Sequence, residues 1–102
     1  IIAKLGYFPK SGQDLLEEVI SAAAPHVKAI SAINTFAAPI YDEKGGQAMP
    51  GRGRLKAGVS GHAIKDIGLD MTERLASIRK RLKYKFEIVG IGGVLDALDA
   101  AV

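Results

Sequence analysis

The sequence predicts an α/β fold in which short parallel strands alternate with helices that cover them. Apolar runs bounded by proline, glycine or polar residues occur at three places in the 102-residue chain, which is typical of strands buried on both faces. Segments with apolar residues at spacings of three and four lie between these runs, as in amphipathic helices. Regular alternation of the two patterns indicates parallel strands joined by helical crossovers.

The first strand and its helix occupy the N-terminal quarter of the chain. Residues 1–8 are mostly apolar and are followed by Pro9, so we predict a buried strand there. Ser11 is a candidate N-cap for the next helix, and Pro25 ends that helix. Its apolar face comprises Leu15, Leu16, Val19, Ile20 and Ala23.

A second strand is predicted over residues 27–33 and ends at the polar pair Asn34 and Thr35. Residues 36–59 are rich in glycine and proline and carry several basic side chains, so we predict a long irregular loop. Loops of this length are usually functional or disordered. A helix is predicted over residues 63–82, and the basic residues near its end suit the negative end of the helix dipole.

A third strand is predicted over residues 86–91 and ends at Gly92 and Gly93. A further helix is expected after Val94, with Leu95, Leu98 and Val102 on one face. Because a strand–helix–strand unit takes about 30 residues or more, about three strand–helix units account for the whole chain.

Composition narrows the functional classes. Hydrophobic residues make up 48% and charged residues 25%, an ordinary globular balance, and the formal net charge of +3 is too small to suggest nucleic acid. The absence of cysteine excludes disulfides and a cysteine nucleophile within these residues, and the two histidines lack metal-ligand spacing. No apolar run reaches the roughly 20 residues of a membrane span. We expect a cytoplasmic protein with no metal site.

Candidate binding residues cluster where the predicted strands end. Asn34 and Thr35 follow the second strand, and two glycine-rich stretches, Gly58–Gly61 and Gly90–Gly93, precede predicted helix starts. Glycine turns at helix N-termini bind phosphate well, although each alone is also explained as a tight turn. Lys4 within an apolar strand either meets a partner or faces solvent on an alternating strand.

Four ordered segments together resemble the dihydroorotate dehydrogenase family. The first matches its strand bearing a flavin-contacting lysine, and the second matches its Asn-Thr pair. The third and fourth match its Gly-Gly-Leu-Ser-Gly-x-Ala-Ile-Lys and Gly-Val-Gly-Gly-Ile…Asp-Ala patterns. The segments here are Ile2–Leu5, Ile33–Thr35, Ala57–Lys65, and Gly90–Val94 with Asp99–Ala100.

The sequence departs from the family pattern at several positions. Ala57 replaces the first glycine, and His62 stands where proline or threonine is usual. Asp66 and Asp70 stand where proline and arginine are frequent. These departures leave open whether the nearer relative is dihydroorotate dehydrogenase or dihydropyrimidine dehydrogenase.

The resemblance implies a flavin-dependent oxidoreductase with FMN as cofactor, oxidising dihydroorotate to orotate in pyrimidine biosynthesis. It implies that Lys4 contacts the flavin ring, and that Asn34 and Thr35 bind the pyrimidine. Gly61, Gly92 and Gly93 would offer backbone N–H groups to the flavin phosphate, and Ser60 is expected among the cofactor-binding residues. The family's catalytic base has no match in this chain, so no catalytic residue is assigned.

The resemblance also implies a fold, the (β/α)₈ TIM barrel. Such a barrel takes about 250 residues, so we expect residues 1–102 to be a partial barrel domain within a longer chain. Two alternatives remain: a non-catalytic fragment that self-associates through unpaired strand edges, and part of another phosphate-binding barrel enzyme of the dihydropyrimidine dehydrogenase type.

Overall fold

A three-stranded parallel sheet forms the centre of the protein. The computed structural model describes residues 1–94. The sheet contains β1 (Ile2–Leu5), β2 (Ala29–Ala32) and β5 (Glu87–Gly90), in the spatial order β1-β2-β5. Both neighbouring pairs are parallel, and the register places Lys4, Ser31 and Val89 in one row across the sheet. The predicted parallel strands are therefore confirmed, each shorter than its apolar run. Their predicted burial holds only for β2 and is wrong for β1 and β5, which have exposed residues.

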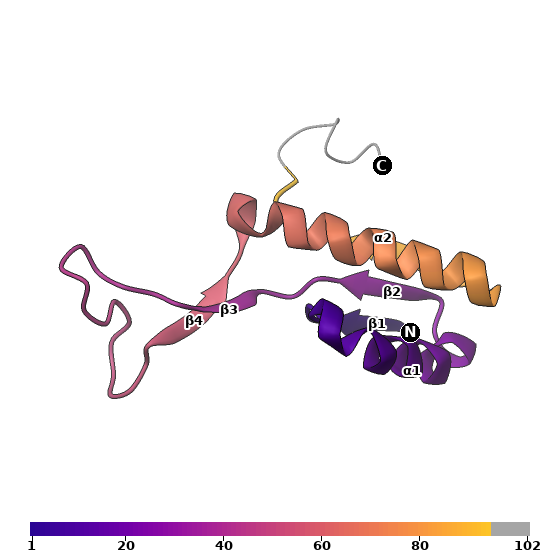
Figure 1. The fold of residues 1–102 in the computed structure, drawn as a ribbon, viewed down its shortest axis with the longest axis horizontal. Helices are drawn as coiled ribbons and strands as arrows, with labels where there is room; N and C mark the ends of the chain where they lie inside the picture. Colours follow the sequence, from indigo (N-terminus) through magenta and orange to yellow (C-terminus); the bar gives the residue numbers. More distant parts are fainter. Residues whose placement is uncertain (95–102) are drawn as a thin grey trace.

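Both helices, α1 (Gln13–Ala23) and α2 (Lys65–Leu82), cover the same face of this sheet (Figure 1). Each crossover moves the chain one position further in the same direction, and right-handed crossovers then place successive helices on one side. A single core results, because side chains of both helices pack with those of the central strand. Its fully buried members include Leu16, Ile20, Ile30, Met71, Leu75 and Ile78.

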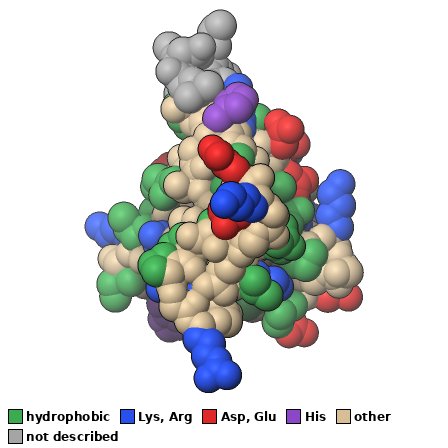
Figure 2. Space-filling view, turned by 90° about the vertical axis from the view of Figure 1, so that its left-hand side faces the viewer, with side chains coloured by type: hydrophobic (Ala, Val, Ile, Leu, Met, Phe, Trp, Pro, Cys, Tyr) green, Lys and Arg blue, Asp and Glu red, His purple; other side chains and the backbone are tan. Residues whose placement is uncertain are grey.

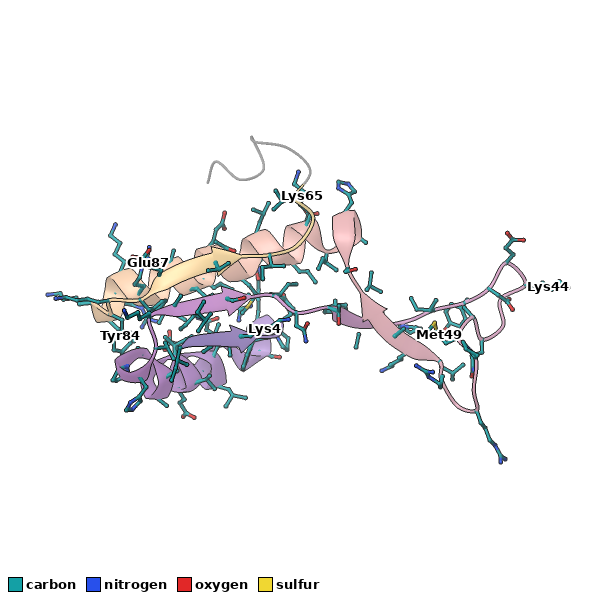
Figure 3. All side chains as sticks on the ribbon, turned by 180° about the vertical axis from the view of Figure 1, so that it is seen from behind. Lys4, Lys44, Met49, Lys65, Tyr84 and Glu87 are labelled. Carbon is teal, nitrogen blue, oxygen red and sulfur yellow. The ribbon has the colours of Figure 1, made fainter. Side chains whose placement is uncertain are left out.

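The opposite face of the sheet carries no helix within residues 1–94 (Figure 3). Strand β1 alternates accordingly: Ala3 and Leu5 pack against the core, whereas Ile2 and Lys4 are exposed. Strand β2 is buried throughout. A same-sided arrangement of this kind is compatible with part of an α/β barrel.

Short 3-10 turns precede or follow the helices and shift the predicted boundaries. These turns are η1 (Lys10–Gly12), η2 (Ala24–His26) and η3 (Gly61–Ile64). Ser11 lies inside η1, and its side chain accepts no hydrogen bond from the first turn of α1, so its predicted role as N-cap is wrong. Gly12 occupies the N-cap position instead. The helix predicted from residue 63 begins as α2 at Lys65 because η3 forms the preceding turn.

Residues 36–59 are not the irregular loop that was predicted. They contain an antiparallel hairpin of β3 (Phe36–Pro39) and β4 (Lys56–Val59), which with the connecting residues 40–55 we call the arm. It projects from the body of the protein (Figure 1). The sequence did not predict these strands, because they contain alanine, glycine and proline where hairpin strands usually have β-branched and aromatic residues.

Hydrogen bonds order the outer part of the arm. The side-chain Oδ1 of Asp42 accepts from the backbone N–H groups of Lys44 and Gly46 at 2.9 Å, and the Ile40 N–H donates to the Leu55 carbonyl at 2.9 Å. Figure 2 faces this end of the molecule, where acidic, basic and hydrophobic side chains are interspersed. The arm tip is thus an ordered surface of mixed character without one continuous apolar patch in that view.

Arg74 of α2 joins that helix to the segment between β1 and α1. Its Nε donates to the Gln13 side-chain oxygen at 2.8 Å, and its Nη1 and Nη2 donate to the carbonyls of Phe8 and Pro9. The side chain is only 11% exposed. These contacts fix α2 relative to the start of α1 and to the segment that precedes it.

No helix within residues 1–94 is long and apolar enough to cross a membrane. The helix predicted after Val94 lies outside the described residues, as do the matched Asp99 and Ala100.

Candidate functional site

A cleft of about 260 Å³ lies at the carboxyl ends of the parallel strands. In parallel α/β folds this edge of the sheet is where ligands usually bind. The polypeptide reaches the cleft from β1, from the turn after β2, from the end of β4 and from the turn after β5. The residues to which the family resemblance gives a binding role all line it: Lys4, Asn34, Thr35, Ser60, Gly61, Gly92 and Gly93.

Backbone hydrogen bonds fix the residues after β2 between its two neighbours. The Asn34 N–H donates to the Leu5 carbonyl at 3.1 Å, and the Ile33 N–H donates to the Ile91 carbonyl at 3.2 Å. These bonds continue the sheet beyond the regular strands. The exposed Asn34 and Thr35 side chains therefore follow backbone that is hydrogen-bonded to the chain after β1 and to the chain after β5.

Lys4 lies on the sheet face opposite the helices and is exposed. The alternating-strand interpretation of this lysine is thereby confirmed. No carboxylate among residues 1–94 forms an ion pair with it. Its ammonium group is a positive charge in the cleft that no described side chain compensates.

Two glycine turns line the cleft. Gly61 has φ +79°, and a Cβ built there meets no atom within 4 Å. Gly92 and Gly93 have φ of +126° and +69°. A Cβ on Gly93 would lie 2.5 Å from the Lys65 Cβ and 2.8 Å from its Cα. Glycine is therefore needed at Gly93 so that this turn can pack against the start of α2.

The other residues that line the cleft are apolar, and the sequence did not indicate them as binding residues. Ile33, Ile64 and Ile91 contribute to the cleft, the first two as buried core residues. Their periodicity assigned them to strand or helix cores, so the sequence carried no separate signal for a ligand. The cleft thus offers an apolar wall beside a cation, a carboxamide and two hydroxyl groups.

No carboxylate, histidine or cysteine lines this cleft in the described part of the chain. Likewise, no cluster of histidine, aspartate or glutamate suited to a metal ion occurs within residues 1–94. The cleft offers one cationic side chain, polar side chains and backbone N–H groups to a ligand.

A second hollow of about 410 Å³ lies between α2 and β5. Small residues of the helix line it, among them Gly68, Thr72 and Ala76. A Cβ on Gly68 would lie 3.0 Å from the Ile91 carbonyl oxygen, so this helix approaches the strand end closely. Of the residues with a predicted binding role, only Gly92 also lines this hollow. We assign no ligand to the hollow.

Comparison with known proteins gives one informative similarity. No protein-family model matches the chain. A curated protein from Dictyostelium discoideum, named dihydroorotate dehydrogenase, is 35% identical over 69 residues, which are 68% of this chain. The matched segment is 19% of that protein, so the chain spans about a fifth of the length of its curated relative.

Proposed function

We propose that this chain is part of a flavin-dependent oxidoreductase of the dihydroorotate dehydrogenase type. One observation carries the proposal: the residues matched to the family's flavin and pyrimidine contacts, far apart in sequence, line a single cleft. The similarity to the Dictyostelium discoideum protein supports the same family independently of that geometry. In this proposal the three described parallel strands would form part of a (β/α)₈ barrel.

The glycine turns fit the phosphate of FMN. Where a Cβ would stand on Gly61 the space is open, so a bulky anion can approach the backbone there. The positive φ values of Gly92 and Gly93 turn the chain back at the strand end, where backbone N–H groups can bind an anion. Ser60 lines the cleft beside them and adds a hydroxyl group.

Lys4 would lie against the flavin ring system. When bound, FMN supplies the hydride-accepting chemistry, which a side chain tunes through charge near the ring. The lysine has no described carboxylate partner, so its positive charge is available to a ligand that becomes more negative on reduction. Its exposure on the open sheet face gives a planar ring direct access.

Asn34 and Thr35 would bind the pyrimidine, with dihydroorotate as substrate and orotate as product. A carboxamide offers both donors and an acceptor, and a hydroxyl offers one donor and acceptor lone pairs. Both complement the alternating N–H and C=O groups of a pyrimidine edge. The cleft of about 260 Å³ is smaller than the roughly 300–1,000 Å³ typical of ligand pockets, so other strands would supply the opposite wall and the base.

Titration of FMN into the purified chain, followed by flavin absorbance and fluorescence, tests the proposal. We expect saturable binding with a shifted flavin spectrum. Lys4→Ala should weaken binding about tenfold, which corresponds to about 1.4 kcal/mol. Lys44→Ala, which removes an exposed lysine on the arm, is the matched control and should leave binding unchanged. Absence of saturable binding, or equal effects of the two substitutions, would contradict this assignment.

A second candidate function is non-catalytic association with another copy of the chain. The observation that favours it is the open sheet face, where Ile2 is 61%, Val89 42% and Ile91 44% exposed. Strands β1 and β5 also each pair on one side only within residues 1–94. Unpaired edges and exposed apolar faces both promote association between chains.

Sedimentation velocity over a concentration series distinguishes this candidate. Association through the open face predicts that Val89→Lys shifts the chain toward monomer. Leu55→Lys, placed on the arm where the side chain is 54% exposed, should leave the distribution unchanged. A wild-type chain that stays monomeric at every concentration would exclude the association.

A further inference from the structure

Gly58 in strand β4 lies directly against the Thr35 side chain. A Cβ built on Gly58 would be 2.3 Å from the Thr35 Oγ1, 2.8 Å from its Cβ and 3.3 Å from its Cγ2. Optimal separations between carbon atoms are about 3.5–4.0 Å. The φ of Gly58 is not in the left-handed region, so glycine is required at this position for space and not for backbone conformation.

The hairpin register brings these two residues near each other. Ala37 pairs with Gly58, and Phe36 pairs with Val59, so Thr35, just before β3, is diagonal to Gly58. Diagonal neighbours are ordinarily about 7–8 Å apart, so the chain before β3 approaches β4 more closely than regular pairing requires. The side chain of Thr35 thus occupies the volume that a residue at position 58 would otherwise fill.

The backbone beside Thr35 has little freedom to yield. The Asn34 N–H is bonded to Leu5, and Phe36 opens the paired strand β3. A side chain at position 58 would meet the Thr35 Oγ1, which rotation about χ1 can move, and the Thr35 Cβ, which only a shift of the backbone can move. The position of Thr35, and with it the position of its hydroxyl in the cleft, therefore depends on the absence of a side chain at Gly58.

We propose that Gly58 is a positioning residue for ligand recognition by Thr35. The inference rests on the proposed function, in which Thr35 contacts a pyrimidine ring. Gly58 itself does not line the cleft, so its effect on binding passes through its neighbour. In this way the arm, through β4, fixes one polar group of a site that is otherwise carried by the parallel sheet.

Methyl NMR on threonine-labelled protein tests the positioning directly. In Gly58→Ala the Thr35 methyl resonance should shift and its side-chain coupling constants should report a new rotamer. The matched control is Gly12→Ala, where the added Cβ meets only Pro9 at 3.9 Å, an ordinary contact outside the cleft. A Thr35 methyl resonance and rotamer that both stay unchanged in Gly58→Ala would overturn the proposal.

Orotate titration, followed by the same resonances, connects the rotamer to recognition. We expect Gly58→Ala to raise the dissociation constant of orotate about tenfold, whereas Gly12→Ala leaves it unchanged. Thr35→Gly removes all three of the closest atoms, so adding Gly58→Ala in that background should have little further effect. Equal effects of Gly58→Ala in both backgrounds would show that it does not act through Thr35.

The two readouts separate this inference from the function on which it rests. A changed rotamer in a protein that binds no orotate would support positioning by Gly58 and contradict the proposed substrate. Orotate binding that is unaffected by Gly58→Ala would contradict the positioning and support the substrate. Should Gly58→Ala fail to fold, folding of the double variant with Thr35→Gly supports the steric contact, and failure of both variants overturns it.

Discussion

Removal of the Arg74 side chain should destabilise the protein more than removal of any exposed ion pair. Arg74 is 11% exposed and donates to the Gln13 side chain and to two carbonyls before α1. Its guanidinium carbon also lies 5.8 Å from the centre of the Tyr7 ring. Arg74→Ala therefore removes one group that joins α2 to the segment between β1 and α1.

The expected loss follows from these contacts. A hydrogen bond that involves a charged group contributes about 1.5–3 kcal/mol, and contacts sharing one side chain are not additive. The aliphatic stem also loses its packing. We therefore expect Arg74→Ala to lower the free energy of unfolding by about 2–4 kcal/mol, a large part of the about 5–15 kcal/mol typical of a domain.

Urea denaturation followed by circular dichroism measures this loss. The control is Arg81→Ala, because Arg81 pairs with Glu17 but is 54% exposed; exposed pairs contribute about 0–1 kcal/mol. Arg74→Lys should lie between the control and Arg74→Ala, since lysine retains charge but not the fork of donors. If Arg74→Ala and Arg81→Ala cost the same, Arg74 does not link the two helices as argued.

Two further substitutions test the backbone. Lys83 follows the last residue of α2 with φ 59°, and the Tyr84 N–H donates to the Arg79 carbonyl at 3.1 Å. Lys83→Gly should raise the melting temperature, because glycine avoids the backbone strain of about 1 kcal/mol that lysine has at this φ. A lower melting temperature would refute this. Gly93→Ala should destabilise the protein more than Gly61→Ala. Both glycines have positive φ, but only a Cβ on Gly93 would overlap backbone atoms, those of Lys65. Equal losses of unfolding free energy in urea denaturation would refute this.

The parallel sheet and its helices could be predicted because their signals are local. Apolar runs identified all three parallel strands, and the spacing of Met71, Leu75 and Ile78 identified the core face of α2. Boundaries were less accurate. The predicted N-cap Ser11 forms part of a 3-10 turn, because a serine near a helix start carries no information on which residue takes the cap geometry.

The arm could not be predicted, because its strands are formed by pairing and not by propensity. Phe36–Pro39 contains two alanines and a proline, and its partner strand contains glycine. Neither shows the alternation that identifies a hairpin. The hairpin is stabilised by pairing between two segments of low strand propensity. Such pairing cannot be recognised from either segment alone.

The site was predicted in part. The matched motifs named residues that the structure gathers around one cleft, whereas their roles in binding remain proposals. Gly58 was named only as part of a glycine-rich stretch, since its contact with Thr35 depends on hairpin register. A glycine required for the space of a neighbour is indistinguishable in sequence from one required for a turn.

The arm leaves and re-enters the fold at adjacent points, because Phe36 and Val59 are paired. The segment between these residues therefore has both ends held together whatever its length. Loop-closure entropy grows only slowly with length, by about 0.6 kcal/mol per doubling. The outer part of the arm can accordingly lengthen, shorten or accept an inserted sequence while the β2–α2 crossover keeps its course. This part of the chain can evolve in size and surface independently of the parallel sheet that it adjoins.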